Sequence, residues 1–165
     1  MMKTIAIVLS RFTDPVSRLV SLLNGCNFTH VSLALDTDMD AMYSFTFKGF
    51  TKESAAKFKR HGVEQVKCYQ LRISDGAYQQ LKQRIARFET HREDYRYSLL
   101  GVICCFLHIP YHAEKKYFCS QFVAESLQAA RAVYLRKRPA RYLPGNLMRE
   151  LNASLQLARV QYHPL

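Results

Sequence analysis

Residues 29–35 read Thr-His-Val-Ser-Leu-Ala-Leu, and this stretch decides the fold because its side chains alternate with a period of two. Val31, Leu33 and Leu35 fall on one face of the predicted strand, which we expect to pack a hydrophobic core. The opposite face begins with His30 and continues with the small side chains of Ser32 and Ala34. Small residues leave room for a helix to pack across that face, close to the imidazole.

The neighbouring segments continue the pattern of a sheet. Residues 3–9 form a short apolar run that predicts a first strand rather than a signal peptide, because charged residues follow before any small-residue cleavage site. An acidic turn at 36–40 leads into residues 42–47, which are typical of the returning arm of a hairpin. Further strands are predicted at 63–73 and 155–162.

Four helices are predicted between these strands. Their start signals are a capping residue or an N-terminal proline, and their stop signals are glycine or proline. The first helix begins at Asp14-Pro15 and ends at Gly25, with an apolar stripe of Val16, Leu19, Val20 and Leu23. The second starts at Ser74, the third is an apolar helix over 97–109, and the fourth begins at or near Cys119. The sequence therefore predicts an α+β fold, a small mainly antiparallel sheet with packed helices, in a single domain spanning 1–165.

Positive charge dominates the composition, with 24 Lys and Arg against 13 Asp and Glu and a formal net charge of +11. The excess gathers at residues 57–60, 115–116 and 136–138, which favours anionic partners, although a solvated basic face explains it as well. Nucleic acid is not expected, because no recognition motif with interleaved basic and aromatic residues accompanies these clusters. A phosphate-bearing substrate or peripheral contact with an anionic membrane fits them equally well.

The cysteines and histidines indicate neither disulfides nor a metal site. Five cysteines, an odd number with two adjacent, make a poor disulfide framework and predict a reducing, cytoplasmic location. Cys104, Cys105, His108 and His112 lie close together, yet they match none of the usual structural zinc spacings. The acidic turn at 36–40 lacks the glycine and the bidentate glutamate of a calcium loop. We expect no metal and no cofactor.

Cys119 and His30 are the residues that can carry chemistry. Cys119 stands where the chain passes from a loop into a helix, and the unpaired N–H groups of a helix N-terminus favour thiolate and could form an oxyanion hole. If that helix lies across the face of His30, the imidazole can reach the sulfur. A nucleophile with a base is the minimum that a thiol hydrolase needs.

Three segments resemble a known family. Residues 29–35, 42–45 and 117–124, the last reading Tyr-Phe-Cys-Ser-Gln-Phe-Val-Ala, are similar to the YiiX/YebB-type branch of the NlpC-like, circularly permuted papain superfamily, in which histidine precedes cysteine. The resemblance covers roughly residues 3 to 130. It implies a circularly permuted papain-like fold and a cysteine peptidase or amidase that acts on amide, peptide or ester bonds with Cys119 as nucleophile and His30 as base.

The family's third position is a polar residue that orients the imidazole, and here the sequence departs from the usual glutamate, glutamine, asparagine or histidine. Hairpin registers with a three-residue turn place Ser44 or Thr46 opposite His30, and we expect Ser44 to take the role. Glu53 is the alternative, because a carboxylate orients an imidazole better than a hydroxyl does.

Two classes of function follow. The first is a thiol hydrolase, or a lipid or other acyltransferase of the same fold, that takes a small peptide, amide or lipid-like substrate of anionic character. The second is a catalytically silent module that uses the basic face to bind an anionic ligand. An ordered Cys119–His30 pair that faces an open cleft favours the enzyme. The sequence defines neither the substrate nor the oligomeric state.

Overall fold

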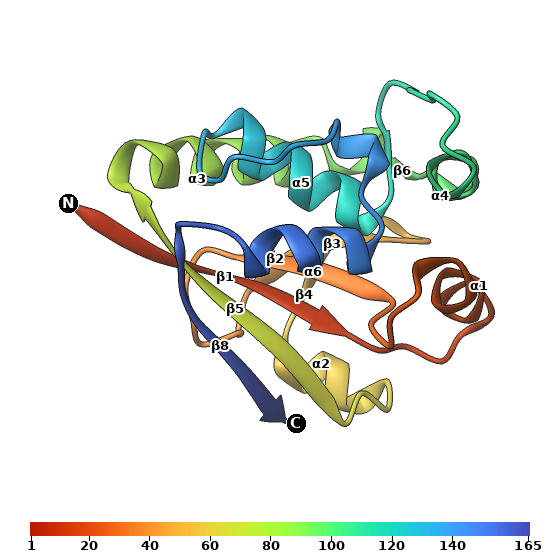
Figure 1. Cartoon of the computed structure of the whole chain (residues 1–165), viewed down its shortest axis with the longest axis horizontal. Helices are drawn as coiled ribbons and strands as arrows, with labels where there is room; N and C mark the ends of the chain where they lie inside the picture. Colours follow the sequence, from red (N-terminus) through yellow and green to blue (C-terminus); the bar gives the residue numbers. More distant parts are fainter.

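A single antiparallel sheet of six strands forms the centre of the protein, in the order β4-β3-β2-β1-β5-β8 (Figure 1). This computed structural model describes the backbone of residues 1–165 and all side chains except those of Val16, Leu19 and Asn24. The six strands are β1 (Met2–Ser10), β2 (His30–Ala34), β3 (Met42–Thr46), β4 (Gly49–Glu53), β5 (Gln65–Ser74) and β8 (Leu157–Pro164). A two-stranded parallel pair joins β6 (Arg96–Tyr97) to β7 (Lys116–Tyr117).

Helices lie on both faces of the sheet (Figure 1). They are α1 (Pro15–Asn24), α2 (Ala55–Arg60), α3 (Asp75–Thr90), α4 (Leu99–Phe106), α5 (Cys119–Ala129) and α6 (Pro144–Asn152), with 3-10 turns η1 (Arg92–Asp94) and η2 (Pro139–Arg141). No helix in the described part of the chain is long and apolar enough to cross a membrane. The α+β class and the antiparallel sheet predicted from sequence are therefore confirmed.

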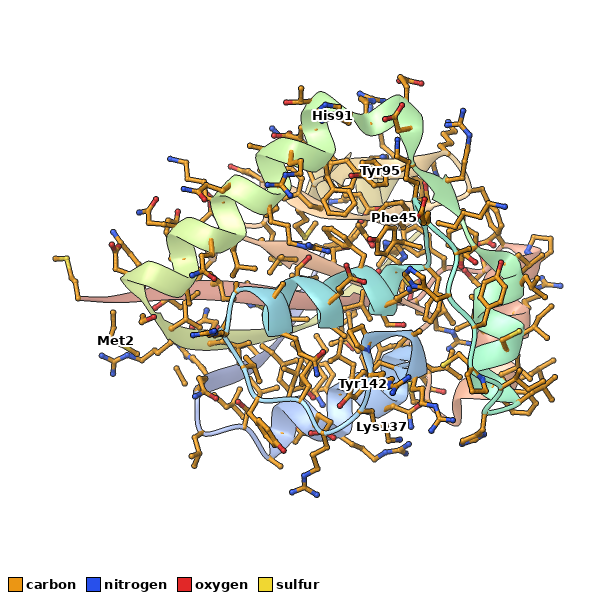
Figure 2. All side chains as sticks on the ribbon, turned by 90° about the horizontal axis from the view of Figure 1, so that it is seen from above. Met2, Phe45, His91, Tyr95, Lys137 and Tyr142 are labelled. Atoms are coloured by element: carbon orange, nitrogen blue, oxygen red, sulfur yellow. The ribbon has the colours of Figure 1, made fainter. Side chains whose placement is uncertain are left out.

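The larger core lies between the sheet and helices α3, α5 and α6. Val31 and Leu33 of β2 pack there against Phe122 and Leu127 of α5. An aromatic group around Phe45 fills the end of this core, where the rings come from the sheet, from α3 and α5, and from the strap that contains Tyr95 (Figure 2). Aromatic rings bury large apolar areas, so this group anchors the helices to the sheet.

The opposite face of the sheet packs a smaller core against α2. Ala6, Val8 and Ala34 belong to one buried cluster with Phe58 of that helix. The expectation that the helix of Cys119 covers the His30 face of β2 is therefore wrong. Val31 and Leu33 are larger and more apolar than serine and alanine, so the amphipathic α5 buries more surface on their face.

The predicted elements agree with the structure at most positions. The strands at 3–9 and 63–73 and the helices starting near Pro15, Ser74 and Cys119 are confirmed within about two residues, the usual uncertainty of element ends. The stripe residues Val16 and Leu19 lie outside the described side chains. The predicted helix over 97–109 is shorter, because His108 takes a φ of 59°, the left-handed conformation that ends many helices.

Strand β4 and helices α2 and α6 were not predicted. Strand β4 begins at Gly49, whose φ is 85° and whose missing Cβ would lie 2.6 Å from the carbonyl oxygen of Tyr95. Only glycine combines this conformation with so close an approach of another backbone. The tight turn from β3 into β4 is what brings Glu53, at the far end of β4, back to β2.

Candidate active site

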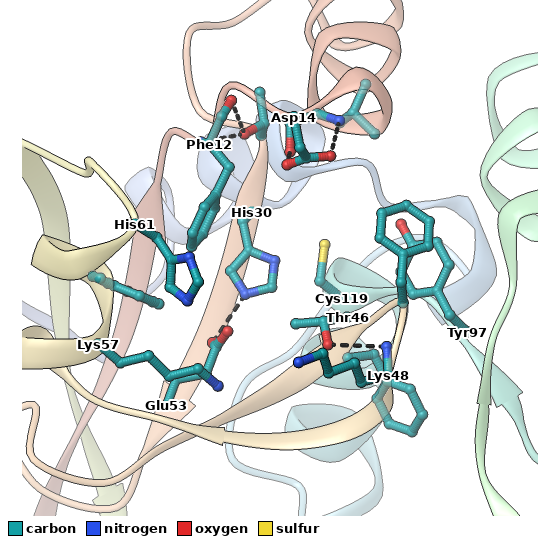
Figure 3. Close-up of a pocket in the computed structure, with 16 residues that line it drawn as sticks. Phe12, Asp14, His30, Thr46, Lys48, Glu53, Lys57, His61, Tyr97 and Cys119 are labelled. Carbon is teal, nitrogen blue, oxygen red and sulfur yellow. Dashed lines mark hydrogen bonds and ion pairs between the residues drawn. The ribbon is translucent and has the colours of Figure 1, made fainter.

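A cavity of about 230 Å³ opens at the end of the sheet where α1, β2, β3, β4 and the start of α5 meet. Most of its lining surface is apolar, and titratable side chains stand on several sides of it, among them Asp14, Glu53 and Lys48 (Figure 3). Cys119, His30 and Glu53 all line it. The two residues that the sequence singled out for chemistry therefore share one cavity.

Cys119 is the first residue of α5. The preceding Phe118 has extended backbone angles and is buried against Val102 and Leu143, which stops the helix from starting earlier. Ser120 holds the same turn, since its hydroxyl donates a hydrogen bond of 2.6 Å to the carbonyl oxygen of Tyr142. The first N–H groups of a helix have no partner within it, so the sulfur lies beside backbone donors.

His30 is the first residue of β2, at the end of the sheet. Its ring packs edge-on against Phe12, with ring centroids 5.2 Å apart, and against Phe58 at 6.3 Å. Nε2 lies 2.9 Å from Oε2 of Glu53. These three contacts fix the ring plane and leave Nδ1 on the side of Cys119 (Figure 3).

Glu53 is the last residue of β4 and is almost fully buried. Oε2 also accepts a hydrogen bond of 2.6 Å from the hydroxyl of Ser32, the next inward residue on the His30 face of β2. The carboxylate is therefore held by two residues of one strand. Burial alone would raise the pKa of Glu53, but His30, the Ser32 hydroxyl and Lys57 together lower it.

The imidazole is charged in this arrangement. Burial alone would lower the pKa of His30, but the Glu53 carboxylate and the Cys119 side chain outweigh burial and raise it to about 10. At neutral pH the site thus holds a protonated imidazole between a carboxylate and a sulfur. A buried charge pair of this kind persists only with good hydrogen bonds, which Glu53 and Ser32 provide.

The expected role of Ser44 needs correction. Its hydroxyl donates to the carbonyl oxygen of Val31 across the β2–β3 pair and not to the imidazole. Thr46 shares a hydrogen bond of 3.0 Å with Thr51. The structure instead brings the alternative, Glu53, to His30. The longer glutamate side chain reaches His30 from β4, one strand beyond β3, whereas the short serine hydroxyl bonds the backbone of the neighbouring strand.

Cys119 meets His30 although α5 covers the other face of the sheet. Because His30 is the first residue of β2, its side chain passes the end of the strand, where the N-terminus of α5 also lies. Figure 3 shows the side chain of Cys119 beside the His30 ring. For a catalytic pair of this kind we expect the sulfur and a ring nitrogen to lie about 3–4 Å apart.

Tyr97 is a cavity residue that sequence reasoning missed. Burial raises its pKa, and the neighbouring Cys119 and Asp14 raise it further, so the phenol stays protonated and can donate a hydrogen bond. Tyr97 ends β6, two residues before the apolar α4, and nothing in that pattern marks it as functional. Lys48 and Lys57 add positive charge to the cavity wall.

No cluster of three or more His, Cys, Asp or Glu side chains with the geometry of a metal site occurs among the described residues. Nδ1 of His108 instead lies within hydrogen-bond distance of the carbonyl oxygen of Phe106, and Cys105 lies on the buried side of α4. These side chains are accounted for by local structure.

Comparison with known proteins adds no assignment. The chain matches no protein-family model. A search of curated proteins finds no significant match. The function must therefore be argued from the cavity itself.

Proposed function

We propose that the protein is a thiol hydrolase with a papain-like, circularly permuted arrangement, in which Cys119 is the nucleophile, His30 the acid–base and Glu53 the positioning residue. The observation that carries this proposal is the convergence of the three side chains on one cavity, with the carboxylate 2.9 Å from Nε2. The order of histidine before cysteine in the chain agrees with a permuted topology. Nucleophile, base and orienting group in series form the triad arrangement that supports acyl transfer.

In the proposed mechanism Cys119 attacks as a thiolate while His30 carries a proton. The sulfur attacks the carbonyl carbon of an amide or ester, and the carbonyl oxygen takes the negative charge. The backbone N–H of Cys119 and the Tyr97 phenol are the donors available to that oxygen. His30 then protonates the leaving amine or alcohol as the carbon–heteroatom bond breaks, which leaves a thioester on Cys119.

Deacylation uses the same groups in reverse. Neutral His30 takes a proton from water, the hydroxide attacks the thioester, and the released sulfur regains its partnership with the imidazolium. Glu53 stays ionised throughout, because His30 and Ser32 lower its pKa. Its part is to hold the ring in one tautomer and to stabilise the positive charge.

The cavity lining indicates the kind of substrate. Phe12, Phe47 and Phe58 offer apolar contacts, whereas Lys48 and Lys57 offer positive charge. An amide, peptide or ester with an apolar portion and an anionic group fits both features. We also propose a reducing location such as the cytoplasm, since all five cysteines are free thiols.

An activated ester tests the proposal without knowledge of the natural substrate. With p-nitrophenyl acetate we expect a burst of nitrophenol and a single acetyl group on the peptide that contains Cys119, read by mass spectrometry. Cys119→Ser and His30→Ala should lose the burst. Cys26→Ser is the matched control, because this thiol is partly exposed and does not line the cavity. Acetylation spread over several cysteines, unchanged in His30→Ala, would contradict the proposal.

A further inference from the structure

Helix α4 exposes an unusual amount of apolar surface. Its buried side consists of Gly101, Val102, Cys104 and Cys105, and the opposite side faces solvent. The exposed residues of this side and of the turn after it, here called the α4 face, are Leu99, Leu100, Ile103, Phe106, Leu107 and Ile109. Leu107 is 54% and Ile109 50% exposed. Contiguous apolar patches of this kind on a protein surface mark interaction sites.

A basic loop lies directly beside the α4 face. Arg141 donates a hydrogen bond of 2.9 Å to the carbonyl oxygen of His108, which ties η2 to the end of α4. Residues 110–112 and 136–141 line a common hollow of about 860 Å³. The basic loop, defined as Arg136, Lys137, Arg138 and Arg141, is exposed and contains no acidic residue.

The acids near the hollow do not cancel this charge. Glu125 lines it, but its carboxylate binds Arg84 and the Tyr117 hydroxyl. Glu114 is balanced by its neighbours, because Lys116 follows it closely and Lys115 pairs with Asp94. Cys105, on the buried side of α4, is close enough to the loop for its charges to act on the thiol. Burial raises the pKa of Cys105 to about 11, although Lys137 and Arg141 act to lower it.

We infer that the α4 face and the basic loop together form a docking surface for an anionic lipid membrane. An interfacial helix buries its apolar side at the boundary between headgroups and acyl chains, and flanking lysines and arginines bind the anionic headgroups. The fold keeps the two components together through the Arg141–His108 bond. Lys137 lies at the surface of this region beside Tyr142, whose hydroxyl accepts its backbone N–H (Figure 2).

Charge complementarity favours a membrane over a second copy of the chain. Two copies that met through their α4 faces would bring two basic loops together, and like charges oppose such a contact. A membrane with anionic lipids offers an apolar interior and negative charge at once. The inference is independent of the proposed hydrolase activity, because none of its residues lines the cavity of Cys119.

Flotation with lipid vesicles tests the inference. We expect the protein to bind vesicles of phosphatidylcholine with phosphatidylserine, to bind pure phosphatidylcholine at least about tenfold less, and to detach as salt is raised. Arg136→Gln with Arg138→Gln should weaken binding about 30-fold, from about 1 kcal/mol for each basic residue. Phe106→Ser should weaken it at least about tenfold through lost apolar burial.

Matched variants keep the result specific. Lys59→Gln with Lys82→Gln removes the same charge from α2 and α3, and Leu155→Ser removes a leucine that is 98% exposed elsewhere. Both should bind within about twofold of the parent protein, since surface changes of this kind rarely alter folding. Circular dichroism shows that each variant is folded.

Three results would overturn the inference. They are absence of vesicle binding by the parent protein, equal and salt-independent binding to both kinds of vesicle, and self-association in sedimentation that Phe106→Ser abolishes without any effect on lipid binding. The last result would assign the α4 face to contact between copies.

Discussion

Replacing Glu53 by Gln separates the charge of the site from its shape. Glutamine keeps the size of the side chain but removes the carboxylate that lies 2.9 Å from Nε2 of His30. At that distance, with an effective dielectric constant of about 20, the attraction between the two charges is about 6 kcal/mol. One pKa unit corresponds to about 1.4 kcal/mol, so this attraction can raise a pKa by about 4. Burial opposes it, in keeping with the net rise of the His30 pKa from 6.5 to about 10.

In Glu53→Gln the pKa of His30 should therefore fall to about 6, below neutrality. Cys119 then loses its cationic partner at pH 7, where an unassisted thiol with a pKa of ~8.5 is only a few per cent thiolate. We expect the alkylation of Cys119 by limiting iodoacetamide at pH 7 to slow at least about tenfold. The difference should shrink as pH approaches about 10, where the parent imidazolium also loses its proton.

The assay is peptide mapping by mass spectrometry over a pH series, with circular dichroism to show that each variant is folded. Glu64→Gln, an exposed acid that leaves the cavity intact, is the matched control and should react like the parent protein. If folded Glu53→Gln reacts at the parent rate at pH 7, the carboxylate does not set the charge of His30, and the acid–base assignment fails.

Four further predictions follow from the same geometry. In the parent protein iodoacetamide should alkylate Cys119 ahead of the other thiols, because burial raises the pKa of Cys68 and of Cys105. His30→Ala should slow the alkylation of Cys119 alone. Equal slowing at Cys26 would contradict the pairing of Cys119 with His30. Tyr97→Phe should lower the rate of the nitrophenyl ester burst about 100-fold, as loss of one oxyanion donor does, while the alkylation of Cys119 stays within about twofold; an unchanged burst would remove Tyr97 from the oxyanion site. Gly49→Ala should lower the free energy of unfolding in urea by about 2–4 kcal/mol, since it adds a methyl group 2.6 Å from a backbone oxygen at positive φ, and a loss below about 0.5 kcal/mol would show that the turn relaxes. Finally, the pKa of His30 is raised in the folded state and that of Glu53 is lowered. The free energy that this pair adds to folding should therefore be fully present between about pH 4.5 and 6.5, decrease as pH rises through about 10, and decrease again in acid. Glu53→Gln should flatten both limbs of the curve of stability against pH.

Local patterns in the sequence predicted much of the fold. The alternation over residues 29–35 predicts β2, and the capping residues Asp14 and Ser74 mark the starts of two helices, because these signals act between near neighbours in the chain. Strand β4 escaped prediction since its turn depends on a backbone approach from Tyr95, far along the sequence. Local periodicity contains no information on such contacts.

The candidate site shows the same division. Cys119 and His30 were found from residue type and position within an element, whereas their meeting point depends on which face of the sheet α5 covers. Helix α5 packs on the face of β2 that carries Val31 and Leu33, whose side chains are larger and more apolar. The preference for Ser44 over Glu53 assumed that the residue directly opposite on the neighbouring strand is nearest, but side-chain length let the second strand along supply the partner.

The cavity draws its groups from β2, near the beginning of the chain, and from α5, near its end. Under the proposed mechanism the thiol gains its reactivity only when the sheet has formed and α5 has docked on it. A nascent or unfolded chain would present five ordinary thiols with no fast one among them. The alkylation rate of Cys119 would then measure the progress of folding. In a refolding experiment, the increase of this rate with time would report the docking of α5 on the sheet, separately from the earlier gain of helix and strand seen by circular dichroism.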